Sequence, residues 1–141
     1  MVRVELHRVD QDFKMEAVND AGNIIHMDAG PSDGGHESGF RPMQLLLAAF
    51  GGCSSIDLIT ILRKQREPVN DLKVTVTGER EQGVMPSLYT GVHAHFRLFG
   101  DINNEKAERA VQLSVDKYCS VAKILEKTAK VTYSFEIINN A

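Results

Sequence analysis

Residues 42–66, PMQLLLAAFGGCSSIDLITILRKQR, decide the fold, because they predict one long helix that is apolar on nearly every face. Pro42 suits the first turn of a helix, and the basic residues at the far end suit the C-terminal end of its dipole. A helix of this composition is typical of a buried central element. Because one small domain offers limited cover, we expect a second copy of the chain to complete its burial.

Strand patterns lie on both sides of this helix. Apolar and polar residues alternate before it, with turn residues between the runs, which predicts a three-stranded meander and then a loop at 29–40. After it, two strands, two helices and a last strand follow, with Asn104 expected as an N-cap. The order β-β-β-α-β-β-α-α-β indicates an α+β fold in one domain, residues 1–141. The expected elements after the first helix span residues 72–80, 90–99, 104–118, 120–127 and 131–137.

Size and charge exclude several classes of protein. The chain has 141 residues and a formal net charge of -3, so nothing in its composition favours nucleic acid as a partner. The N-terminal residues carry charges every few positions and lack the apolar core of a signal peptide. We find no uninterrupted run of about 18 apolar residues and therefore expect no membrane span. These features predict a cytoplasmic protein.

Cys53 lies in the middle of the long helix, directly after Gly51 and Gly52. Each glycine costs a helix about 1 kcal/mol relative to alanine, so a close approach of another backbone or of a substrate is the expected reason for the pair. Together with Ser54, the glycines indicate room around a thiol. The alternative is that Cys53 is a small apolar residue of the core, because free cysteine is among the most buried residue types.

Cys119 is the second cysteine and lies at the start of the short helix predicted at 120–127. The amides and dipole at such a position favour a thiolate and predict a lowered pKa. Packing beside Tyr118 is the alternative. The two cysteines are 66 positions apart, so only the fold can bring them together.

His93 and His95 share one face of a predicted strand, where a metal could bridge them. A solvated strand face is the more ordinary interpretation, because no third ligand is spaced nearby. Motifs for nucleotide binding, serine hydrolysis and zinc proteolysis are absent from the sequence. The sequence therefore predicts no metal and no cofactor.

Two stretches, RPMQLLLAAFGGCSSIDLITIL (41–62) and LSVDKYCSVAKILEKTAKVTYSFEI (113–137), resemble the OsmC/Ohr superfamily and are closest to its YhfA-like branch. The resemblance implies an intertwined homodimer with a redox site at the subunit interface. It implies a thiol-dependent hydroperoxide reductase, an antioxidant enzyme in which Cys53 attacks the peroxide and Cys119 resolves the sulfenic acid as a disulfide. A dithiol, such as that of a lipoylated protein, would reduce this disulfide. Organic hydroperoxides are the implied substrates, in an apolar pocket formed by Leu46, Phe50 and the partner chain.

The sequence departs from the family pattern at Met43. Active members carry a glutamate at this position, ten residues before the helix cysteine, which orients an arginine over the sulfur. Here Arg41 is the candidate for that charge, assisted by Glu37 or Gln44, and a solvated loop arginine is the alternative. The departure also favours an alternative function: a non-peroxidase dimer that binds a small apolar or thiol-reactive ligand at the interface.

Overall fold

The computed structural model describes residues 1–139, and the contacts of the chain divide it into two units, Met1–Leu46 and Leu47–Ala141. Each unit has a three-stranded sheet of its own. The elements follow in the predicted order, so the α+β fold class is confirmed. The assignment of residues 1–141 to a single domain stays a prediction.

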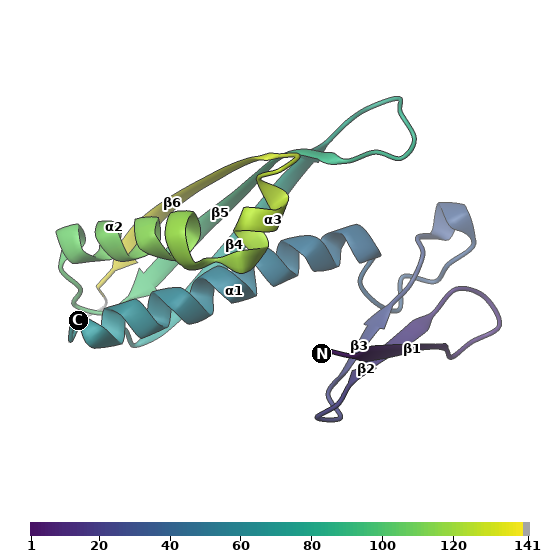
Figure 1. The fold of residues 1–141 in the computed structure, drawn as a ribbon, viewed down its shortest axis with the longest axis horizontal. Helices are drawn as coiled ribbons and strands as arrows, with labels where there is room; N and C mark the ends of the chain where they lie inside the picture. Colours follow the sequence, from purple (N-terminus) through teal and green to yellow (C-terminus); the bar gives the residue numbers. More distant parts are fainter. Residues whose placement is uncertain (140–141) are drawn as a thin grey trace. The chain divides into compact units, whose positions relative to one another are not determined.

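The N-terminal unit is the predicted meander (Figure 1). Its strands are β1 (Val4–Arg8), β2 (Met15–Asn19) and β3 (Ile24–Met27), and both pairs are antiparallel. Ala17 is opposite Leu6 on one side and Ile25 on the other, as the period of two requires. The loop that follows contains one short 3-10 turn, η1 (Pro31–Asp33).

The second sheet has the strand order β4-β5-β6. β4 (Asp71–Arg80) pairs antiparallel with β5 (Tyr89–Phe99), and β5 pairs parallel with β6 (Lys130–Ile138). Parallel neighbours need a crossover connection, which is here entirely helical. It consists of α2 (Asn104–Leu113), the π-helical turn η2 (Ser114–Tyr118) and α3 (Ser120–Leu125).

The start of α2 lies one residue away from the prediction. Asn103, rather than Asn104, is the N-cap, and its side-chain oxygen accepts a hydrogen bond from the Lys106 amide at 3.0 Å. Both positions are asparagine, so composition alone could not separate them. The backbone decides, because Asn103 has the extended conformation that a capping residue needs.

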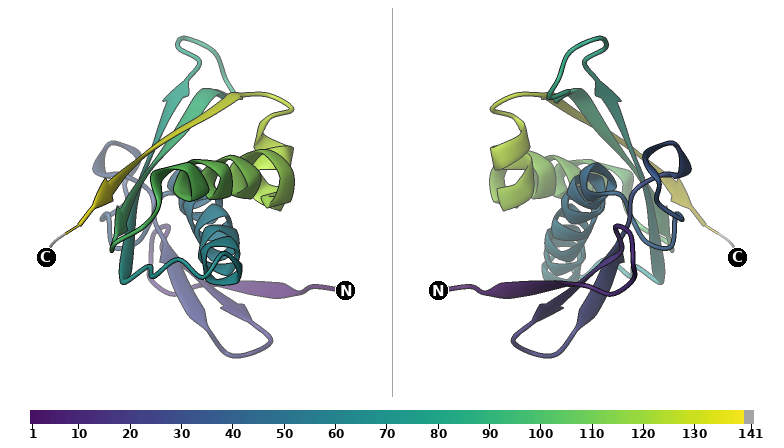
Figure 2. Two further views of the ribbon diagram at one scale, coloured as in Figure 1. Left: turned by 90° about the vertical axis from the view of Figure 1, so that its left-hand side faces the viewer. Right: turned by 90° about the vertical axis from the view of Figure 1, so that its right-hand side faces the viewer.

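The helices α1 (Pro42–Lys64), α2 and α3 lie on one side of the second sheet (Figure 2). On β5 the side chains of Val92, Ala94, Phe96 and Leu98 are buried toward them, while His93, His95 and Arg97 point to the other face. The helix α1 (Pro42–Lys64) contributes one buried row at a spacing of four residues, consisting of Phe50, Ser54, Leu58 and Leu62. This row and the inner face of the sheet form the core that holds the site.

Gly51 allows α1 to pack closely on the sheet. A Cβ added to Gly51 would lie 2.9 Å from Cγ2 of Val76 on β4, which is closer than side chains pack. A group does approach this glycine closely, but it is a valine side chain rather than the backbone or substrate that was expected. Gly52 differs, because a Cβ there would meet no described atom within 4 Å.

The single chain covers only part of α1, as expected for one small domain. Its buried residues face the sheet, whereas Ile56 on another face is 68% exposed, and burial by a second copy stays a prediction. By length and composition, α1 is also long and apolar enough to cross a membrane. The absence of an uninterrupted apolar run did not predict this property. The core helix of a folded domain has the same length and apolar composition. The full burial of Phe50, Leu58 and Leu62 shows that α1 belongs to the core.

Candidate redox site

Cys53 and Cys119 come from opposite ends of the second unit and meet in its core. Cys53 lies on α1 and is half-buried, whereas Cys119 caps α3 and has no exposed surface. The two thiols are near each other, because Cys53 is among the groups that affect the pKa of Cys119. The structure thus brings together two sulfur atoms that are 66 positions apart in the sequence.

Two further groups contact the sulfur of Cys119. The Ser54 hydroxyl donates a hydrogen bond to it at 3.2 Å, and the Ala122 amide donates another at 3.3 Å. The amide bond forms because Cys119 has an extended backbone directly before α3, with φ -75° and ψ 106°. Cys119 is therefore an N-cap in which sulfur takes the place of the usual side-chain oxygen.

The expected low pKa of Cys119 is wrong. Burial raises the pKa of this thiol above its usual value, and the neighbouring Cys53 raises the pKa further. The hydrogen bonds from Ser54 and Ala122 act in the opposite direction but are outweighed. Desolvation disfavours the charged thiolate, and the full burial of Cys119 agrees with the alternative interpretation of this residue as a packing residue. Its raised pKa disfavours the Cys119 thiolate, and Cys53 is the less buried of the two residues.

Arg41 belongs to the N-terminal unit and makes the contacts expected of it there. Its guanidinium forms an ion pair with Glu37, with Nη2 and Oε1 2.8 Å apart. Its backbone amide donates a hydrogen bond to Oε1 of Gln44 at 3.0 Å. Both partners named from the sequence thus contact Arg41, which is about half exposed.

Sequence reasoning missed Asp28, which organises the loop before Arg41. Its carboxylate accepts hydrogen bonds from the amides of His36 and Ser38 and from the Ser38 hydroxyl. These bonds, with the Ser38 amide as the largest cause, lower the pKa of Asp28 to about 2. The signal available in the sequence was an aspartate at the start of a loop rich in Gly and Ser, where carboxylates commonly bind backbone amides.

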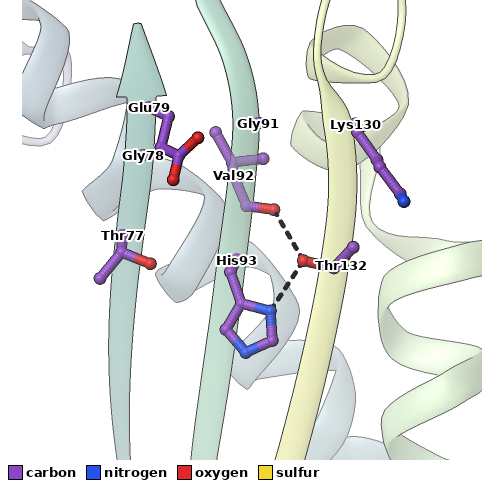
Figure 3. Close-up of a pocket in the computed structure, with 8 residues that line it drawn as sticks. All are labelled: Thr77, Gly78, Glu79, Gly91, Val92, His93, Lys130 and Thr132. Atoms are coloured by element: carbon purple, nitrogen blue, oxygen red, sulfur yellow. Dashed lines mark hydrogen bonds between the residues drawn. The ribbon is translucent and has the colours of Figure 1, made fainter.

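Both ring nitrogens of His93 contact hydroxyl groups of neighbouring residues. Nδ1 of His93 is 2.7 Å from the Thr132 hydroxyl, which also contacts the Val92 carbonyl at 3.4 Å (Figure 3). Nε2 of His93 is 2.9 Å from the hydroxyl of Ser134, which also contacts Nδ1 of His95 at 2.7 Å. These contacts favour the solvated strand face over a bridged metal.

The same outer face of the sheet carries a shallow hollow of about 230 Å³. Its lining residues lie on β4, β5 and β6, as Figure 3 shows. The cysteines lie among the helices on the opposite side of this sheet. The hollow is thus separate from the thiol pair. Phe50, which was expected to line a substrate pocket, is also fully buried in the core.

Comparison with known proteins identifies the class of this chain. Residues 35–134 match the family of OsmC-like proteins, so the chain belongs to that family. Protein YhfA of Escherichia coli K12 is 41% identical to it over 119 residues, which cover 84% of this chain and 85% of YhfA. The resemblance to the YhfA-like branch is therefore confirmed.

Solved structures agree with this assignment. A hypothetical protein from Aquifex aeolicus superposes with a TM-score of 0.85 at 28% identity, covering 100% of this chain and 98% of its own. An organic hydroperoxide resistance protein OsmC from Legionella pneumophila has a TM-score of 0.73 at 17% identity, covering 96% of each chain, and shares the fold. The OsmC-like fold is thus confirmed.

Proposed function

We propose that this protein is a thiol-dependent hydroperoxide reductase with Cys53 as the attacking residue and Cys119 as the resolving residue. The observation that carries the proposal is the pair of neighbouring cysteines, of which Cys53 is half-buried and Cys119 fully buried. An attacking thiol must meet peroxide, whereas a resolving thiol needs only to reach the first sulfur. The exposures of the two cysteines fit these two roles.

The reaction has three steps that balance. The Cys53 thiolate attacks a peroxide oxygen and breaks the O–O bond, which yields a sulfenic acid and, after proton uptake, an alcohol. Cys119 then attacks the oxidised sulfur, forms the Cys53–Cys119 disulfide and releases water. A dithiol, such as that of a lipoylated protein, reduces this disulfide and is itself oxidised to a disulfide.

Reduced protein treated with one equivalent of cumene hydroperoxide tests this cycle. Intact-mass analysis should show the loss of two hydrogens within seconds, and peptide mapping should place the new bond between Cys53 and Cys119. Hydrogen peroxide in a parallel sample should react more slowly if organic peroxides are the substrates. An unchanged mass over many minutes in folded protein would instead favour a non-peroxidase that binds a small apolar or thiol-reactive ligand.

The active form is proposed to be a homodimer. The support is the apolar surface that α1 leaves uncovered, which includes Ile56, together with the open space beside Gly52. Exposed apolar surface of this kind is typical of a face that another chain covers.

Substitution Ile56→Asp should therefore convert a dimer to monomers in analytical ultracentrifugation. Val84→Asp, at a similarly exposed loop position, is the control and should leave the mass unchanged. A monomeric wild-type protein would refute the dimer.

Arg41 is proposed to supply the positive charge that favours the Cys53 thiolate. Active family members use a glutamate at the position of Met43 to orient the arginine. In this chain the Glu37 carboxylate takes that role, because its ion pair with Arg41 fixes the direction of the guanidinium. Arg41→Gln should slow the first oxidation of Cys53 by roughly tenfold, which corresponds to about 1.4 kcal/mol of activation free energy. Stopped-flow kinetics with cumene hydroperoxide measure this rate. As a control, Arg8→Gln changes another exposed arginine of the same unit and should not alter this rate. Equal rates for the wild type, Arg41→Gln and Arg8→Gln would show that Arg41 does not activate Cys53.

A further inference from the structure

Ser54 is the polar member of the otherwise apolar row that α1 buries against the sheet. Its side chain has no exposed surface, and a buried hydroxyl destabilises a protein unless it is hydrogen-bonded. Helical serines and threonines commonly donate to the carbonyl one turn earlier, as Thr60 does to Ile56 in this helix at 2.9 Å. Ser54 instead donates to the sulfur of Cys119, across 65 positions of sequence.

The direction of this hydrogen bond affects how readily Cys119 forms a thiolate. A hydroxyl that donates to sulfur stabilises the thiolate more than the thiol, and the Ala122 amide does the same from the other element. Burial opposes them, because it disfavours the charged form of Cys119. The Ser54 hydroxyl is therefore one of two groups that help a fully buried sulfur to ionise.

We propose that Ser54 is a positioning residue for the resolving step, holding the Cys119 sulfur beside Cys53 and stabilising its thiolate while it attacks. The inference rests on the proposed two-cysteine cycle and adds a third residue to it. In this step Cys119 gives up its proton and its sulfur bonds to the Cys53 sulfur of the sulfenic acid. The S–O bond breaks, and the departing hydroxide takes up a proton to form water.

A test without peroxide separates this inference from the proposed function. Reduced protein is mixed with the aromatic disulfide 5,5′-dithiobis(2-nitrobenzoate), which the accessible Cys53 attacks, releasing one coloured thiolate and leaving a mixed disulfide. Cys119 then attacks the Cys53 sulfur, closes the internal disulfide and releases a second coloured thiolate. The rate of this second release measures resolution alone, whether or not the protein reduces peroxides.

Ser54→Ala should slow the second release about tenfold near neutral pH and move the midpoint of its pH profile to higher pH, while the first release keeps its rate. Ser55→Ala is the matched control. It removes a neighbouring hydroxyl that has no hydrogen-bond partner in the described part of the chain, and it should change neither phase.

A second pair of variants holds packing constant. Ser54→Thr keeps a hydroxyl and Ser54→Val has the same shape without one, so Thr should resolve faster than Val by about tenfold. This comparison also serves if Ser54→Ala does not fold, which thermal unfolding will show. Equal second-phase rates and pH midpoints in wild type and Ser54→Ala, or in the Thr and Val variants, would overturn the inference. Loss of peroxide consumption with these differences intact would instead count against the proposed function alone.

Discussion

Substitution of Cys53 by serine should abolish peroxide consumption. Serine has nearly the same size, but its hydroxyl is far less acidic than a thiol and does not form a stable product analogous to a sulfenic acid. The first-turnover rate with cumene hydroperoxide should fall by at least about a thousandfold, or about 4 kcal/mol of activation free energy. Because Cys53 is half-buried on a helix whose packing face is formed by other residues, the fold should remain intact.

Peroxide remaining in solution and the intact mass of the protein measure this effect together. The wild-type protein should consume one equivalent and lose two hydrogens, whereas the Cys53→Ser protein should keep its mass. Ser55→Ala is a useful companion, because it changes the same helix without touching either sulfur. Peroxide turnover that persists in Cys53→Ser would show that another group carries the reaction.

Substitution of Cys119 by serine should leave the first step and remove the second. Cys53 should still consume one equivalent of peroxide, but its sulfenic acid then has no resolving thiol. Intact-mass analysis should show the addition of one oxygen, and then of a second as excess peroxide produces sulfinic acid. The steady-state rate of peroxide reduction with a dithiol reductant should fall by about a hundredfold or more, which corresponds to about 2.7 kcal/mol of activation free energy.

The order of products distinguishes this outcome from general damage. Dimedone, which reacts with sulfenic acids, should label Cys119→Ser at Cys53 and should label the wild-type protein weakly, because the disulfide forms first. A Cys119→Ser protein that turns over like wild type with no oxygen added to Cys53 would contradict a resolving role for Cys119.

Most of the fold could be predicted from local pattern. The period-two runs around Ala17 and Val92 and the apolar segment after Pro42 specify their elements with little help from tertiary context. The contacts of Arg41 with Glu37 and Gln44 could also be anticipated, because the partners lie within one turn of the chain.

The parts of the site that depend on distant contacts could not be predicted. No spacing rule joins Cys53 to Cys119, and the raised pKa of Cys119 follows from a burial that tertiary packing creates. The Ser54 hydroxyl could equally have bonded to its own helix, as Thr60 does. The exposed side of α1 shows the same limit, because composition predicts that an apolar face will be covered without saying whether the same chain covers it.

The position of Cys119 inside the helical crossover between two parallel strands also affects the topology of the oxidised protein. A Cys53–Cys119 bond would close a covalent ring that contains all of β4, β5 and α2. A closed loop of this length removes conformational freedom from the unfolded chain and should stabilise the fold by about 4 kcal/mol. Oxidation by peroxide would therefore raise the free energy of unfolding of the protein that carries it out, and reduction would lower it again.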